Sequence, residues 1–267
     1  MKAFKHLEIV EAGNGVVEVR FARPPVNAVD QAMYREIAEL FSDIDMVGED
    51  VRAVVLAGNG PHFCGGNDLD EFATMTPENG AERMWRVREA FFAVMDCSVP
   101  VIGAVEGVAI GTGLALAASC DFVVASETAR FGLPELTVGV MGGARHLARL
   151  APQPLVRRMF LTGEMMAAPD FAAAGGSVIV AKPAELLADA HAFAKRTAAL
   201  SPTAVRVGKG VLNRIEWMDL RQGYEFEQAA TVRMSGFPDS KEALAAFRQK
   251  RPASYAPLSR RNRLYGR

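Results

Sequence analysis

The chain has 267 residues, of which 50% are hydrophobic and 23% charged, and its 31 acidic and 30 basic side chains give a formal net charge of −1. This composition is typical of a folded protein and excludes an acidic disordered chain. The even charge balance argues against a dedicated nucleic-acid binder, because such proteins usually carry a basic excess. The cysteines and histidines form no CxxC or HExxH motif, so neither a disulfide framework nor a metal site is expected. With no apolar signal segment or membrane-spanning stretch in view, we expect a cytoplasmic protein without membrane insertion.

The first half of the chain alternates between strand-like and helical patterns. Asn14-Gly15 between two apolar runs is a hairpin signal, and Asp30 is a suitable N-terminal cap for the first helix. In chain order, the patterns predict strands over residues 7–10, 16–21, 51–57, 99–105 and 121–125, and helices over residues 30–47, 80–95 and 112–119. Strands that alternate with helices predict an α/β domain with parallel crossovers.

Beyond Gly142-Gly143 the chain becomes mainly helical. The patterns predict helices over residues 144–150, 154–161, 184–200, 203–215, 218–234 and 240–250, and one short strand over residues 178–180. Ser201-Pro202 marks the predicted boundary between a core, residues 1–200, and a helical tail, residues 201–267. The tail has too few buried-type residues for a core of its own, so we expect it to pack on the core or on another subunit. Its last residues, 255–267, carry four arginines and are expected to be solvated.

Two glycine-rich turns and one acidic residue remain once familiar motifs are excluded. The chain has no P-loop, no GxGxxG and no GxSxG motif, which argues against nucleotide hydrolases, dinucleotide oxidoreductases and α/β-hydrolases. The turns, Gly65-Gly66-Asn67 and Gly111-Thr112-Gly113, each follow a predicted strand, and Glu135 lies in a later turn. Two N–H groups that point at one oxygen form an oxyanion hole, and N–H groups at a helix start are unpaired. Alone, this pattern is weak, because such turns more often only permit close packing.

An ordered set of further motifs makes the function more specific. The segments are residues 23–28 (Arg-Pro-Pro-Val-Asn-Ala), 51–56, 63–69 (Phe-Cys-Gly-Gly-Asn-Asp-Leu), 100–107, 120–121 (Cys-Asp), 129–135 (Ala-Arg-Phe-Gly-Leu-Pro-Glu) and 161–164 (Leu-Thr-Gly-Glu). Together they closely resemble the enoyl-CoA hydratase/isomerase (crotonase) family from about residue 5 to residue 253. The resemblance implies an α/β fold, a crotonase-like spiral of ββα units with a C-terminal helical segment. That segment supports homotrimers, often paired into hexamers, and covers the pocket.

The same resemblance implies an acyl-CoA thioester substrate and a site that stabilises its enolate. CoA is part of the substrate, so no separate cofactor is implied. The backbone N–H groups of Asn67 and Thr112 match the family's oxyanion hole, and Glu135 matches its acid/base. The other positions implied to contact the substrate are Gly65, Gly66, Asp68, Leu69, Gly111, Gly113, Ala115, Met141 and Gly142.

Two departures from the family pattern bear on the reaction. Hydratases of the family use a second glutamate on the helix after the second turn, where this chain has Ala115, and the loop over residues 138–143 is shorter than in most relatives. Asp70 and Glu71 are candidate replacements for the missing carboxylate, although simple solvation is the favoured interpretation. Met75 and Met141 are candidate pocket residues, and core packing is the simpler role for each. The candidates for the CoA phosphates are Arg23, Lys250 and Arg251.

A single carboxylate suffices to move a proton between carbons, whereas hydration uses two around one water. We therefore favour double-bond isomerisation, or hydration of an unusual enoyl thioester, over fast hydration of simple ones. One alternative is a non-catalytic or specialised acyl-CoA-binding relative, which would bind CoA thioesters without turnover. The other is an α/β nucleotide binder outside the family, which would bind nucleotides and no CoA thioester.

Overall fold

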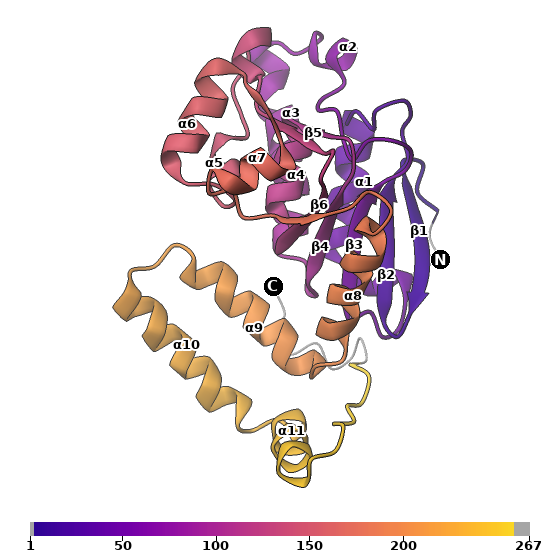
Figure 1. The fold of residues 1–267 in the computed structure, drawn as a ribbon, viewed down its shortest axis with the longest axis vertical. Helices are drawn as coiled ribbons and strands as arrows, with labels where there is room; N and C mark the ends of the chain where they lie inside the picture. The colour runs from indigo at the N-terminus through magenta and orange to yellow at the C-terminus, as the bar shows by residue number, and fades with distance from the viewer. Residues whose placement is uncertain (1–2, 259–267) are drawn as a thin grey trace.

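The computed structural model describes residues 3–258 and is organised around two β-sheets (Figure 1). The larger sheet has the strand order β1-β2-β3-β4-β6-β9, in which β1 and β2 form an antiparallel hairpin and the other neighbours are parallel. Its strands are β1 (Leu7–Gly13), β2 (Val16–Phe21), β3 (Ala53–Gly58), β4 (Val101–Val105), β6 (Phe122–Ser126) and β9 (Ile179–Ala181). The central strands consist almost entirely of buried apolar residues, as expected for a parallel sheet covered on both faces.

Helices cover both faces of the larger sheet. Val54 and Leu56 face a core with α1 (Gln31–Ser42), α3 (Pro77–Met95) and α4 (Thr112–Ser119), while Val55 and Ile102 face α8 (Leu186–Ala198). The shorter elements of this part are η1 (Ile44–Val47), α2 (Leu69–Phe72), η2 (Glu135–Val138), α5 (Ala144–Leu147), α6 (Gln153–Thr162) and α7 (Ala168–Ala173). This alternation of α and β elements confirms the predicted fold class.

A smaller sheet brings the two glycine-rich turns together. It has the order β5-β7-β8, with β5 (Val108–Ile110) parallel to β7 (Arg130–Gly132) and β7 antiparallel to β8 (Met165–Ala167). The segment after β3 joins the free edge of β5, because Cys64 N donates to Val108 O at 3.0 Å and Ile110 N donates to Cys64 O at 3.1 Å. The segment around Cys64 and strand β5 therefore end next to each other, and a glycine-rich turn follows each of them.

Most predicted elements of the first half are present, and the largest boundary difference is at the end of α1. Asp30 caps α1 by accepting from Met33 N at 2.7 Å. The predicted helix over residues 30–47 ends at Ser42, because Asp43 leaves the helical conformation and the 3₁₀-helix η1 follows. The strands β5, β7 and β8 were not predicted, since three residues are too few to show a period.

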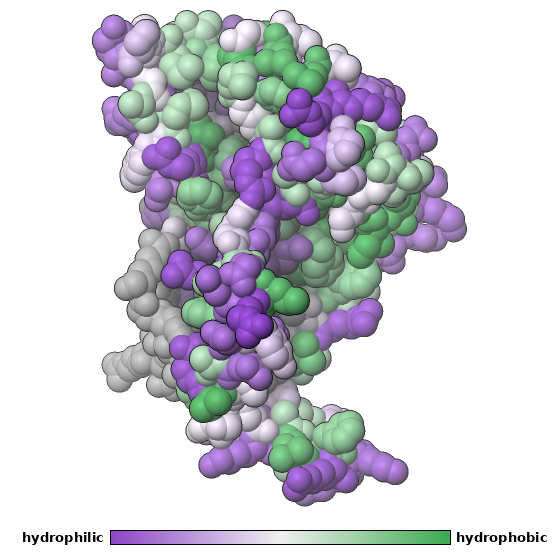
Figure 2. Space-filling model, turned by 90° about the vertical axis from the view of Figure 1, so that its left-hand side faces the viewer, coloured by the Kyte–Doolittle hydropathy of each residue, from purple (hydrophilic) through white to green (hydrophobic). Residues whose placement is uncertain are grey.

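The tail consists of α9 (Pro202–Ile215), α10 (Leu220–Met234) and α11 (Pro238–Gln249), and Ser201 caps α9. Buried Lys209 anchors α9 to the sheet, since its Nζ donates to Val99 O at 3.0 Å and to Asp121 Oδ2 at 2.7 Å. Figure 2 shows apolar side chains between polar ones on the lower part of the molecule, where Figure 1 places the tail. The exposed apolar side chains of the tail include Trp217, Leu220, Val232 and Phe247. The predicted solvated end, with Arg260, Arg261, Arg263 and Arg267, lies outside the described residues.

Within residues 3–258, none of the helices combines the length and apolar character needed to cross a bilayer. The same part of the chain has no group of three or more His, Cys, Asp or Glu side chains placed to hold a metal ion.

Candidate active site

The two glycine-rich turns pack directly against each other. The contact needs a glycine at position 113, because a methyl group there would lie 2.2 Å from the carbonyl oxygen of Cys64. Gly66 has a φ of 109° and would place a methyl group 3.3 Å from Ile110 O. Gly65 N donates to Val26 O at 2.8 Å, which connects the first turn to the segment before α1. The glycines at 65, 66 and 113 therefore allow backbone to approach backbone where these segments meet.

The backbone N–H groups of Asn67 and Thr112 have no acceptor within residues 3–258. Thr112 is the first residue of α4, so its N–H is one of the unpaired donors at the positive end of the helix dipole. The preceding Gly111 has a φ of 53° and provides no side-chain cap. Two free donors on neighbouring turns are the arrangement that an oxyanion hole requires.

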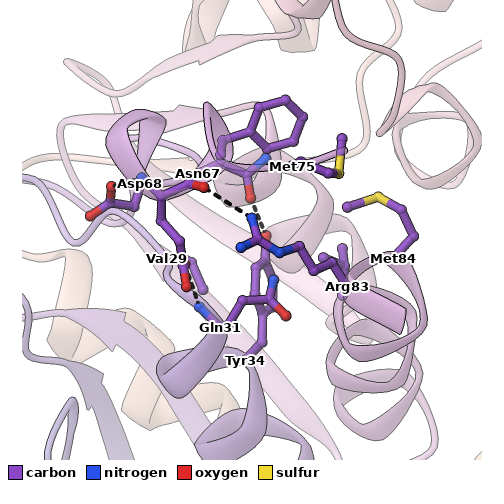
Figure 3. A pocket seen from close by; sticks show the side chains of 11 residues that line it. Val29, Gln31, Tyr34, Asn67, Asp68, Met75, Arg83 and Met84 are labelled. Carbon is purple, nitrogen blue, oxygen red and sulfur yellow. Dashed lines mark hydrogen bonds between the residues drawn. The ribbon is translucent and has the colours of Figure 1, made fainter. Parts of the chain in front are cut away.

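The side chains of Asn67 and Thr112 meet at one buried phenol that the sequence did not indicate. Tyr34, on α1, has only 1% of its surface exposed. Its hydroxyl donates to Asn67 Oδ1 at 2.5 Å and lies 2.8 Å from Thr112 Oγ1. Figure 3 shows the phenol of Tyr34 directed at Asn67. The Thr112 side chain is thus held by Tyr34.

Glu135 lies beside the second turn, at the start of η2. The pairing of Ile110 with Gly132 brings the chain after β7 next to Gly111, and a methyl group on Gly111 would lie 3.0 Å from Glu135 Oε1. Burial raises the pKa of the Glu135 carboxyl from 4.5 to about 7, opposed by a hydrogen bond from its own backbone N–H. Its Oε2 atom is buried and has no hydrogen-bond partner in the described part of the chain. A partly buried carboxyl with a pKa near 7 is suited to accept and return a proton.

The raised pKa of Glu135 has a consequence for stability. The folded state holds this proton up to about pH 7 and the unfolded state only up to about pH 4.5. The resulting stabilisation is full below the unfolded pKa and is lost as pH rises through the folded pKa. We therefore expect Glu135→Gln to become progressively more stable than the native chain between about pH 5 and pH 8. Urea unfolding of both proteins across this range measures the difference, and a constant difference would contradict the assignment.

Among residues 3–258, no second carboxylate lies beside Glu135. Ala115 is fully buried on α4, and no neighbouring charge contributes to the raised pKa of Glu135. Asp70 is exposed, whereas Glu71 lines the adjacent pocket and accepts from Gln31 N at 2.7 Å through Oε2. Glu71 is thus already bound to the first turn of α1, and neither acid takes the place of the missing glutamate.

A small pocket opens between α1, α2 and α3, next to Asn67 (Figure 3). Its apolar wall includes Met75, as the sequence suggested, together with Val29, Phe72, Met84 and Val87. Polar groups enter it from Gln31, Tyr34, Asn67 and Arg83. The guanidinium of Arg83 is held by Glu71 O at 3.0 Å and Thr74 Oγ1 at 2.8 Å.

The other predicted site residues lie at the edge of this arrangement. Asp68 caps α2 by accepting from Glu71 N at 2.9 Å and pairs with Arg23. Leu69 is 62% and Met141 75% exposed, and Gly142 is exposed as well. These three residues therefore form no enclosed wall in this chain.

The candidate phosphate-binding cations differ in their ion pairs with carboxylates. Arg23 also pairs with Asp30, and Arg251 pairs with Glu242, so both already have carboxylate partners. Lys250 ends α11 with a φ of 53°.

Comparison with known proteins places this geometry in a family. The family model described as enoyl-CoA hydratase/isomerase matches residues 11–257. A probable enoyl-CoA hydratase from Rhizobium meliloti is 34% identical over 92% of this chain and 96% of that protein. A (7aS)-7a-methyl-1,5-dioxo-2,3,5,6,7,7a-hexahydro-1H-indene-carboxyl-CoA hydrolase from Rhodococcus jostii is 35% identical over 84% of this chain and 86% of that protein.

Solved structures agree with this assignment. The crystal structure of an enoyl-CoA hydratase from Mycobacterium smegmatis superposes with a TM-score of 0.88 at 30% identity, covering 93% of this chain and 98% of that one. The chain therefore belongs to the enoyl-CoA hydratase/isomerase family, and its fold is the crotonase fold.

Proposed function

We propose that this chain is an acyl-CoA enzyme that stabilises a thioester enolate and moves protons with one carboxylate. The N–H groups of Asn67 and Thr112 bind the thioester oxygen, and Glu135 is the acid/base. The observation that carries the proposal is a partly buried carboxyl with a pKa of about 7, next to a turn whose N–H group, like that of the neighbouring turn, has no acceptor within residues 3–258. CoA is part of the substrate, and the proposed chemistry needs no further cofactor.

Double-bond isomerisation illustrates the proposed chemistry. Starting from a 3-enoyl-CoA, ionised Glu135 takes a proton from C2, and the electron pair moves into the thioester to give a dienolate. The two N–H groups hold the negative oxygen of this intermediate. Protonated Glu135 then returns the proton to C4, so that the double bond forms between C2 and C3. The enzyme ends in the state in which it began.

The missing second carboxylate supports isomerisation over hydration. Hydration must position a water and move two protons, which family hydratases divide between two glutamates. Here Ala115 occupies the second position, and no acid replaces it within residues 3–258. The names of the relatives include both hydratases and a hydrolase of CoA compounds, so similarity to them does not select one overall reaction.

Parallel assays with crotonyl-CoA and but-3-enoyl-CoA test this choice. We expect conversion of but-3-enoyl-CoA to exceed hydration of crotonyl-CoA in kcat/KM by at least about tenfold. Fast crotonyl-CoA hydration would contradict the argument from Ala115. If calorimetry detects binding of butanoyl-CoA but neither substrate is turned over, the chain is the non-catalytic relative instead.

The tail supports an oligomer of this chain. Its exposed apolar side chains, with Leu220 at 90% and Phe247 at 83% exposure, are the kind of surface that subunit contacts bury. We propose that α9, α10 and α11 form the contacts of a homotrimer or of a dimer of trimers.

A further inference from the structure

We infer that Tyr34 is a positioning residue that holds the two oxyanion-hole N–H groups at their working separation. It does so by joining the side chains of Asn67 and Thr112. This inference rests on the proposed function, because the two N–H groups are its assumed catalytic donors.

The directions of the hydrogen bonds define a chain of three side chains. A tyrosine hydroxyl carries a single hydrogen, and that of Tyr34 is donated to Asn67 Oδ1 at 2.5 Å. The Thr112 hydroxyl, 2.8 Å away, must therefore donate to the Tyr34 oxygen. The hydrogen bonds thus run from the Thr112 hydroxyl to the Tyr34 hydroxyl and from there to Asn67 Oδ1. Consecutive hydrogen bonds of this kind strengthen one another.

These hydrogen bonds add a side-chain link between three segments that backbone hydrogen bonds already bring together next to the two turns. Asn67 ends the turn after β3, Thr112 begins α4, and Tyr34 belongs to α1, which packs extensively against α3. The Tyr34 ring is 1% exposed and packs edge-to-face on Phe91 of α3, with ring centroids 6.2 Å apart. A phenol fixed by two helices is a rigid reference point for both donors.

Tyr34 acts through Asn67 and Thr112 rather than on the substrate itself. Both of its hydroxyl contacts are satisfied by protein atoms, and burial raises its pKa far above the usual value, so the phenol stays neutral. The side chains of Asn67 and Thr112 and the phenol of Tyr34 thus form one structural unit.

The test measures how strongly bound acetoacetyl-CoA is held as its enolate. This β-ketoacyl thioester has an ultraviolet enolate band, so titration of the complex gives the apparent pKa of the bound ligand. We expect Tyr34→Phe to raise that pKa by about one unit, which corresponds to a tenfold weaker hold on the enolate. It should also lower kcat for but-3-enoyl-CoA about 10- to 100-fold while KM changes much less.

A double-variant background separates positioning from general damage. In Asn67→Ala/Thr112→Gly the phenol has no partner, so adding Tyr34→Phe should change kcat by less than about twofold. Tyr224→Phe is the matched control, because Tyr224 is 58% exposed on α10 and does not line the pocket next to Asn67. If Tyr34→Phe does not fold, Thr112→Val removes the donor and keeps the Tyr34–Asn67 bond, and it should shift the ligand pKa in the same direction.

Two results would overturn the inference while leaving the proposed function intact. One is an unchanged ligand pKa and kcat in Tyr34→Phe; the other is a full loss that persists in the double-variant background. If the native protein itself does not lower the pKa of bound acetoacetyl-CoA, the proposed function fails instead.

Discussion

Replacing Glu135 by glutamine is expected to lower kcat for but-3-enoyl-CoA by about 10²- to 10⁴-fold, the usual contribution of a positioned acid/base. Glutamine keeps the size and the partly buried position of the side chain but cannot take a proton. Because burial raises the pKa of Glu135 to about 7, the rate of the native enzyme should rise as pH passes through that value. This pH dependence should disappear in the residual activity of the variant.

Glu71→Gln is the matched control for this experiment. Glu71 lines the pocket next to Asn67, its carboxylate is not paired with an arginine, and its Oε2 accepts from Gln31 N. An amide oxygen can accept the same hydrogen bond, so we expect a change of less than about tenfold. A Glu135→Gln variant that keeps its rate, or a Glu71→Gln variant that loses as much, would remove Glu135 from the proposed role.

Gly113→Ala is expected to have the second large effect, on activity and on stability together. The added methyl group would lie 2.2 Å from the Cys64 carbonyl oxygen and 2.8 Å from Cys64 Cβ, so the two turns must separate. Overpacking of this kind costs about 1–3 kcal/mol of unfolding free energy. Displacing the Thr112 N–H relative to the Asn67 N–H should lower kcat by about 10²-fold, as loss of an oxyanion donor does.

Gly210→Ala provides the comparison for Gly113→Ala. Gly210 lies within α9, and a methyl group there would meet no atom within 4 Å. Alanine favours a helix interior over glycine, so the free energy of unfolding should stay equal or rise by up to about 1 kcal/mol. The free energy of unfolding in urea and kcat are to be measured on both variants and compared. Equal behaviour of the two would contradict the close contact at Gly113.

Local patterns predicted the elements that carry a clear signal. The Asn14-Gly15 hairpin, the Asp30 cap and the buried strand near Val54 each have a local cause in their own residues. The two turns were found because glycines stand directly after strands and before helices. The resemblance to the family, rather than any spacing in the sequence, placed Glu135 in the same site as the two turns.

The parts that the sequence did not reveal depend on contacts between distant segments. The strands β5 and β7 are short, and their pairing brings Glu135 to Gly111. Tyr34 lies next to Met33 on the buried side of α1, where a tyrosine looks like ordinary core. Its hydroxyl gains a role only because Asn67 and Thr112 approach it from positions 33 and 78 residues away.

Exchange of hydrogen at the α-carbon of a bound acyl-CoA tests the central claim most directly. Butanoyl-CoA has no double bond to move or hydrate, so its exchange in D₂O, followed by NMR, reports enolate formation alone. We predict that the native protein catalyses this exchange and that Glu135→Gln abolishes it while still binding butanoyl-CoA. Turnover of but-3-enoyl-CoA without any α-carbon exchange, or exchange that is unchanged in Glu135→Gln, would contradict the account.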